Sequence, residues 1–344
     1  MSPSTDPVAP LVAALDRAPD REAWLATYRY RFAHLRRELQ LHPARPTAAA
    51  TFEVAARTAR DVASRNLPLG LALVMHLYPL CALRCVPLPW FSAANRRRTQ
   101  LLHDIDARKL VLANAGSDRA AGAHAPVHVT RTRSGIRIDG TFDYVSLAHV
   151  ADLVLFNAPL TDTSRTIFCI ADMHSRSVDI GDAKFGDGMQ LSDTCALTFH
   201  AHHVPPDRYI EVPTESTLGC MTLYQRSWFH LLLAESHLAR IRQLQRQHEL
   251  AQPLEQMASL NELACLRDYA LHLLDHVSLP SSVESLDKVT AAIKLRVSWL
   301  AQATAAALRD RDHEAAKELG YIRLQPTSDE RVMRAIRSKS AASH

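Results

Sequence analysis

Three closely spaced histidines are the first residues whose types could do chemistry. His200, His202 and His203 lie just before Asp207 in a stretch of alternating character. In a strand, residues 200 and 202 would share a face, and imidazole is a common ligand of zinc. No cysteine or further histidine lies at a supporting spacing in the sequence, and Val204-Pro205-Pro206 is typical of a structural turn. We therefore expect no metal site.

A fourth histidine lies inside an apolar stretch. His76 is surrounded by Leu, Val and Met in the run 67–86. Such a residue can serve as an acid or base, although it is more often satisfied within a core. Cys81 and Cys85, one helical turn apart, could form a thiol site, but cysteine in an apolar helix usually fills space. His76 is kept as a candidate acid/base group.

The composition is that of a weakly basic protein with enough apolar residues for a large core. Of 344 residues, 47% are hydrophobic and 22% charged, with a net charge of +4. The arginines are scattered, which does not indicate nucleic-acid binding.

Six cysteines without a CxxC pair or a secretory leader favour a reducing cytoplasm. His76, Pro79 and Arg84 interrupt the run 67–86, which predicts a buried helix and no membrane span.

The elements that must position these residues change in type along the chain. Helical periodicity extends from Pro10 to about Leu110, with Ser92 capping a helix over 93–105. Alternation around Ser134-Gly135 predicts a β-hairpin. Further strands are predicted at 151–157, 166–171, 177–180 and 196–199, and helices at 223–250, 254–276, 283–308 and after Thr327. We predict an α+β fold with an N-terminal helical domain over 10–107, a central small β-barrel or sandwich domain over 108–212 and a C-terminal antiparallel helical bundle over 213–338.

Three strings within this layout resemble one family. They are Leu110–Asp118, with its Gly-Ser-Asp turn, the hairpin Ser134–Ser146, and Ala196–Asp207, with its Val-Pro turn. Their order resembles the acyl-CoA dehydrogenase superfamily over roughly residues 50 to 337, and most strongly from 108 to 213. The resemblance implies a flavin cofactor, FAD or alternatively FMN, in an oxidoreductase that is a homodimer or homotetramer.

The resemblance also implies which residues hold the flavin. Asn114, Gly116 and Ser117 would lie at the pyrophosphate, where glycine allows close backbone approach. Tyr144 and Ser146 would lie beside the isoalloxazine, as an aromatic wall and a polar contact. The alternative for Tyr144 and Ser146 is simple packing in a β-core and the start of a turn. For Gly116 and Ser117 the alternative is an ordinary surface turn.

The sequence departs from the family at the glutamate that removes the substrate's α-proton. One family position for this base reads Gln225-Arg226, and glutamine cannot take a proton. The other would follow 329–337, and no glutamate occurs between there and His344. Candidate acid/base groups are therefore His76 and, beyond Gln225 on the same predicted helix, Glu235 or His230.

Three functions follow from this departure. The first is a flavin monooxygenase, or an atypical oxidase or dehydrogenase of a carrier-tethered or activated substrate, in specialised metabolism. Monooxygenases of this fold use reduced flavin and oxygen and do not need the glutamate. The second is an acyl-CoA dehydrogenase with a relocated base such as Glu235. The third is a redox-inactive scaffold or partner subunit. The expected partners are a small molecule or acyl thioester, with neither nucleic acid nor membrane.

Overall fold

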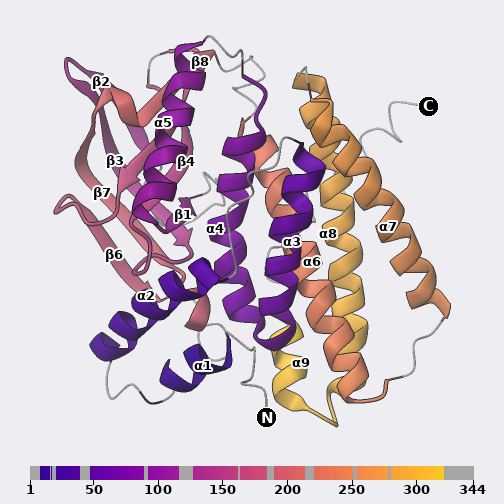
Figure 1. Ribbon diagram of the computed structural model, residues 1–344. Coiled ribbons are helices and arrows are strands. Elements are labelled where there is room, and N and C mark those ends of the chain that lie inside the picture. The colour runs from indigo at the N-terminus through magenta and orange to yellow at the C-terminus, as the bar shows by residue number, and fades with distance from the viewer. Residues whose placement is uncertain are drawn as a thin grey trace.

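The structure is a computed structural model that describes residues 8–15, 17, 21–38, 47–88, 92–115, 127–161, 163–183, 190–213, 221–250, 254–277 and 280–320. Its described elements form a sheet lobe and a helical lobe, with α4 (Leu67–Cys85) and α3 (Ala48–Arg65) between the sheet and the remaining bundle helices (Figure 1). This arrangement confirms the predicted α+β fold class.

The N-terminal third is helical, as its periodicity predicts. Ser92 caps the fifth helix by accepting the Asn95 N–H at 3.1 Å, and Asn66 both ends the third helix and caps the fourth, accepting the Leu69 N–H at 2.9 Å. The elements are α1 (Ala9–Leu15), α2 (Arg21–Glu38), α3 (Ala48–Arg65), α4 (Leu67–Cys85) and α5 (Ala93–Arg108).

Helix α4 is the central helix of the core. It is long and apolar enough to cross a membrane, but 83% of its apolar window is buried inside the protein. It packs against α3, the C-terminal bundle and the first strand of the sheet. The predicted buried helix is therefore present, and its apolar surface is covered by other parts of the same chain.

Glycine at position 70 allows α3 and α4 to approach closely. A Cβ added to Gly70 would lie 2.5 Å from the Ala63 Cβ and 2.7 Å from its Cα. Because neither atom can rotate away, we expect Gly70→Ala to lower the free energy of unfolding by about 1–3 kcal/mol. Urea unfolding would measure the effect. Gly181→Ala is the control, since its new Cβ would meet Ala196 at 3.4 Å, and a comparable loss there would contradict the steric explanation.

The middle third forms one mixed sheet. The predicted hairpin is present as β2 and β3, paired in antiparallel register from His128 opposite Asp139 to Thr132 opposite Gly135. Strands β1 and β4 pair in parallel. The order is β6-β7-β3-β1-β4-β5-β8, with β2 beside β3. The strands are β1 (Leu112–Ala115), β2 (His128–Thr132), β3 (Gly135–Val145), β4 (Leu153–Pro159), β5 (Arg165–Asp172), β6 (Val178–Ala183), β7 (Cys195–Val204) and β8 (Tyr209–Pro213).

The C-terminal third contains the predicted antiparallel helices. Arg226 of α6 bonds both carboxylate oxygens of Asp287 on α8, at 2.7 and 2.6 Å, which fixes these two helices against each other. The helices are α6 (Met221–Gln247), α7 (Leu254–Asp275), α8 (Pro280–Leu308) and α9 (His313–Gly320). The helix predicted after Thr327 lies outside the described residues.

Candidate active site at the junction of sheet and helices

Strand pairing brings three of the predicted flavin residues together. Ala115 of β1 is the partner of Val145 at the end of β3. In this register Asn114 and Ser146 are the next opposite positions, and alternation turns Asn114, Tyr144 and Ser146 to the face opposite the buried Val145. Gly116 and Ser117 follow β1 directly but lie outside the described residues.

Tyr144 and Ser146 differ in exposure and in contacts. Tyr144 is 61% exposed, whereas Ser146 is 5% exposed. The Ser146 hydroxyl lies 2.8 Å from the Thr194 hydroxyl, which in turn lies 2.9 Å from that of Ser192. A hydroxyl can donate one hydrogen bond and accept two, so the Thr194 contact orients Ser146 without using all its capacity. Thr194 was not identified from the sequence, because 48 residues separate it from Ser146.

The backbone on both sides of this hydroxyl pair adopts an unusual conformation. Leu147 has φ of 61° and Asp193 has φ of 46°, a region that is costly for residues other than glycine. Two backbone hydrogen bonds hold these segments together, from Leu147 N to Ser192 O and from Ala148 N to Asp193 O, both at 3.0 Å. Strain of this kind is concentrated at functional sites in proteins, which favours a role for this turn.

Three buried amide side chains lie on the side of the sheet that faces the helices. Asn114 is opposite Leu155 in the parallel β1–β4 pair, and Asn157 lies two residues further along the same face. The Asn157 amide donates to the Gln225 carbonyl oxygen of α6 at 2.7 Å. The Asn114 Nδ2, Asn157 Oδ1 and Gln225 Nε2 atoms are buried without a hydrogen-bond partner among the described residues. Buried polar atoms of proteins are almost always paired, so these atoms are candidate contacts for a bound cofactor.

His76 links the helical lobe to the sheet. Its ring is fully buried on α4, and its Nδ1 accepts the backbone N–H of Leu112 in β1 at 3.0 Å. That bond requires a lone pair on Nδ1, so this nitrogen carries no proton. His76 therefore holds β1, and with it Asn114, against α4.

Glu235 is engaged in ion pairs away from Gln225. Its two oxygens lie 2.9 Å from Arg60 of α3 and 3.5 Å from Arg267 of α7. Glu235 also lies ten residues beyond Gln225 on α6, roughly 15 Å at the rise of an α-helix. The carboxylate therefore joins three helices, and its oxygens are already used by guanidinium groups.

Two further histidines of α6 are kept neutral by their surroundings. Burial, together with the charges of Lys294 and Arg226, holds the pKa of His230 well below its usual value. Burial and Lys294 lower the pKa of His237 to about 3. Both rings accordingly lack a charge at neutral pH.

The depressed pKa of His237 predicts acid sensitivity. Between about pH 6.5 and 3 the unfolded chain binds a proton at His237 that the folded chain does not. The contribution of the neutral His237 ring to the free energy of unfolding is therefore present above pH 6.5 and is lost as pH falls. At pH 5 the loss should be about 2 kcal/mol relative to pH 7. Urea unfolding at both pH values would measure it.

A neutral replacement tests this assignment. His237→Gln should make the loss of stability between pH 7 and pH 5 smaller by about 2 kcal/mol, with the part due to buried His230 remaining, whereas His103→Gln, at an exposed position of α5, should leave the loss as in the wild type. An unchanged slope in the His237 variant would mean that other groups cause the acid sensitivity.

The histidines at 200, 202 and 203 do not converge. Ala201 has φ of 49°, and the register shifts from Phe199 opposite Gly140 to His202 opposite Ile138. This bulge places exposed His200 and buried His202 on different faces, contrary to simple alternation. The histidines contact Asp179, Ser177 and Ser134 respectively, at 2.8, 2.8 and 2.9 Å.

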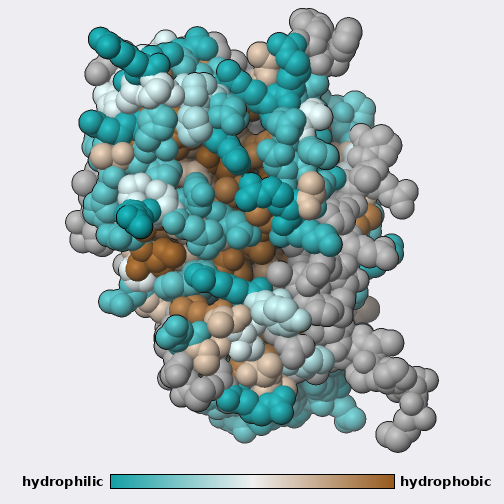
Figure 2. Space-filling model, turned by 60° about the vertical axis from the view of Figure 1, so that its left-hand side comes forward, coloured by the Kyte–Doolittle hydropathy of each residue, from teal (hydrophilic) through white to brown (hydrophobic). Residues whose placement is uncertain are grey.

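A small cavity lies elsewhere, between the end of α4 and strands β5 and β8. Its walls include Leu83, Val86, Phe168 and Val212, and it holds about 20 Å³. Its wall is apolar, and the volume is far too small for a flavin. The face in Figure 2 is mostly hydrophilic, with hydrophobic residues exposed along a central hollow.

Solved structures share this fold, and two of the three described below contain a flavin. A KijD3 in complex with FMN and dTDP-3-amino-2,3,6-trideoxy-4-keto-3-methyl-D-glucose is 16% identical over 98% of this chain and 93% of that chain, with a TM-score of 0.70. PigA with FAD and proline is 16% identical over 94% and 92% of the two chains, with a TM-score of 0.68. FkbI, for biosynthesis of the methoxymalonyl extender unit of Fk520, is 15% identical over 98% and 99%, with a TM-score of 0.65.

These similarities establish the acyl-CoA dehydrogenase-like fold over nearly the whole chain and confirm the predicted fold. No family model matches the sequence, and no curated protein matches it.

Proposed function

We propose that the chain is a flavin-dependent oxidoreductase of specialised metabolism, working as a monooxygenase or as an atypical oxidase or dehydrogenase. The observation that carries the proposal is the β1–β3 pairing, which puts Asn114 beside Ser146 on a face with buried amide atoms that have no hydrogen-bond partner in the described part of the chain. Structures of the same fold contain FMN in KijD3 and FAD in PigA, so either flavin is a candidate here.

The residues present fit a flavin ring. The ring presents carbonyl oxygens and a ring N–H at its pyrimidine edge, and these match amide donors and acceptors. The buried Asn114 Nδ2 is a donor without a partner among the residues that the structure describes, and Ser146 is an oriented hydroxyl. Tyr144 of β3, two residues before Ser146, supplies an exposed aromatic side chain. When bound, the flavin would supply the redox chemistry, and Gly116 and Ser117 would contact its phosphate.

The chain's own residues would position and shield the reacting groups. Ser146, oriented by Thr194, would hold a hydrogen bond at the ring edge, and His76 would keep β1 in place. Gln225 cannot abstract a proton, and both oxygens of Glu235 face arginines. This arrangement favours oxygen-dependent chemistry over α-proton abstraction from an acyl thioester. The substrate would be a small molecule, free or attached to a carrier.

Flavin titration tests the proposal directly. Adding FAD, FMN or either reduced flavin to the purified protein should change the flavin absorption between ~350 and 500 nm and quench its fluorescence. Ser146→Ala and Asn114→Leu should each weaken binding about tenfold, the loss of one hydrogen bond. Thr141→Val is the matched control, since its hydroxyl pairs with that of Thr198 at 3.0 Å between β3 and β7, the two strands that Ser146 follows and Thr194 precedes. No spectral change with any flavin would refute the proposal and favour a redox-inactive scaffold.

A second measurement separates the two redox chemistries. Under anaerobic conditions an acyl-CoA panel should fail to bleach the bound oxidised flavin. With reduced flavin and oxygen, the protein should change the rate of flavin reoxidation from that of free reduced flavin, which reacts with oxygen by itself. Anaerobic bleaching by an acyl-CoA would instead identify a dehydrogenase.

A further inference from the structure

A histidine, an aspartate and a cysteine meet behind the Ser146 turn. His149 follows that turn, Asp193 precedes Thr194, and Cys195 begins β7. The His149 Nδ1, one Asp193 carboxylate oxygen and the Cys195 sulfur all lie within 4.8 Å of one another. Asp193 and Cys195 are buried, while the His149 side chain is 21% exposed.

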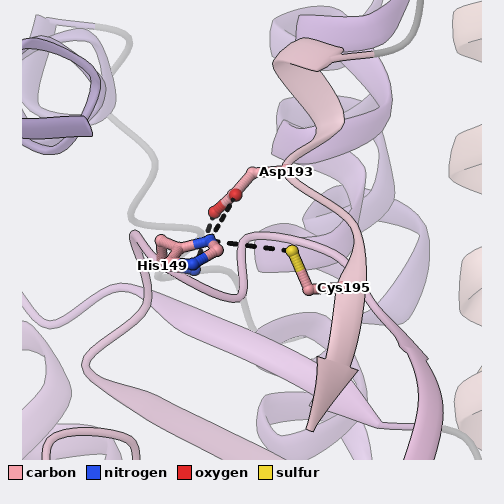
Figure 3. A group of neighbouring side chains, drawn as sticks. All are labelled: His149, Asp193 and Cys195. Carbon is pink, nitrogen blue, oxygen red and sulfur yellow. Dashed lines mark hydrogen bonds and ion pairs between the residues drawn. The ribbon is translucent and has the colours of Figure 1, made fainter. Parts of the chain in front are cut away.

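The geometry excludes a nucleophile relay. Asp193 Oδ1 lies 2.8 Å from His149 Nδ1, and Cys195 Sγ lies 3.6 Å from the same nitrogen. Figure 3 shows both contacts running to one ring nitrogen. A Cys-His-Asp relay needs the thiol at one nitrogen and the carboxylate at the other, so that one orients the ring while the ring takes the thiol proton. These residues cannot work in that way.

The same convergence suits a metal cation. Tetrahedral zinc with the usual bond lengths places a thiolate sulfur about 3.5 Å from an imidazole nitrogen and a carboxylate oxygen about 3.3 Å from that nitrogen. The 3.6 Å separation of sulfur and nitrogen already matches, and the carboxylate oxygen would need to withdraw by about half an ångström.

Neighbouring groups hold the carboxylate in place for this role. The second Asp193 oxygen, Oδ2, accepts the backbone N–H of His149 at 2.7 Å, which leaves Oδ1 directed at the ring nitrogen. The Asp193 side chain is 0% exposed. Its negative charge, after burial itself, helps to raise the pKa of the neighbouring Tyr28 hydroxyl. A cation would neutralise this buried charge.

We propose that His149, Asp193 and Cys195 form a binding site for a zinc-like divalent transition-metal cation, with water as the fourth ligand. Binding removes the thiol proton, and the imidazole proton moves from Nδ1 to Nε2, so one proton is released per metal ion. The bound ion would fasten the turn after Ser146 to the start of β7. The site does not depend on flavin.

Zinc binding by the flavin-free full chain is the test. After treatment with a chelator, competition against a chromophoric zinc indicator should give one site per chain, and cobalt(II) should give a thiolate-to-metal absorption band. Calorimetry in two buffers of different ionisation enthalpy should report one released proton. The thermal midpoint should rise with zinc concentration, because the metal binds the folded state.

Matched variants decide whether these three residues are the ligands. Cys195→Ser and His149→Gln should each weaken zinc binding at least tenfold and abolish the thermal shift, and Cys195→Ser should abolish the cobalt band. Cys265→Ser, at an exposed free cysteine, and His174→Gln, from a His-Asp pair of 3.4 Å, should bind zinc like the wild type. Absence of binding by the wild type, or undiminished binding by Cys195→Ser, would overturn the proposal. Flavin binding by those same preparations would show that the proposed function stands separately.

Discussion

Replacing Glu235 with glutamine should lower the free energy of unfolding by about 2 kcal/mol and leave flavin-dependent turnover per folded molecule unchanged. The change removes the charge that Arg60 and Arg267 share, at 2.9 and 3.5 Å. A fully buried pair would cost about 3–5 kcal/mol, but solvent screens these arginines, whose side chains are 30% and 33% exposed. Denaturant unfolding and oxygen uptake would measure the two quantities.

An exposed ion pair provides the control. Glu262 contacts Arg296 at 2.7 Å, and both side chains are nearly half exposed. Glu262→Gln should therefore change stability by less than about 1 kcal/mol. A large loss of turnover in Glu235→Gln, with the flavin still bound, would restore Glu235 as a relocated base and favour the dehydrogenase alternative.

The Asn157–Gln225 pair should show strong non-additivity. Asn157→Leu or Gln225→Leu alone leaves a buried amide unpaired, which should cost about 2 kcal/mol each. The double variant removes both amides, including the two atoms that lack partners among the described residues, and should be about as stable as the wild type. The expected coupling is therefore about 3–4 kcal/mol, measured by unfolding all four proteins in urea.

The same double variant should lose ligand-dependent activity despite its stability. The control for removing buried polar groups is a second buried pair in the helical bundle, Gln245 and Thr304, at 3.2 Å. The double variant Gln245→Leu/Thr304→Val should keep the flavin spectrum and the turnover of the wild type. The alternative outcome is that the losses in free energy of unfolding of the two single variants simply add. Ordered water would then already satisfy these amides in the wild type, and they would not be ligand-binding groups.

The elements that the sequence predicted correctly are those fixed by local patterns. Ser134-Gly135 sits at the hairpin, where Gly135 has φ of 152° and a Cβ would lie 2.1 Å from the Val204 oxygen. Ser92 caps α5 because its side chain reaches an N–H only three residues away. The apolar run from Leu67 forms α4 because no polar face is present to meet solvent.

The parts that could not be predicted depend on contacts between distant segments. Asn157 meets Gln225 across 68 residues, and His149 meets Asp193 across 44. The bulge at Ala201 carries no glycine to signal it, so alternation placed His200 and His202 on one face. Glu235 was predicted as a possible base from its position on the helix alone. The sequence of α6 does not show that Arg60 of α3 and Arg267 of α7 pair with this carboxylate.

The bond between His76 and Leu112 has a consequence for how the molecule melts. The Leu112 amide of β1 bonds to a helix side chain and not to a neighbouring strand, so moving α4 away from the sheet would leave a buried strand amide unpaired. The two lobes should consequently lose structure in a single calorimetric transition, with van't Hoff and calorimetric enthalpies in agreement.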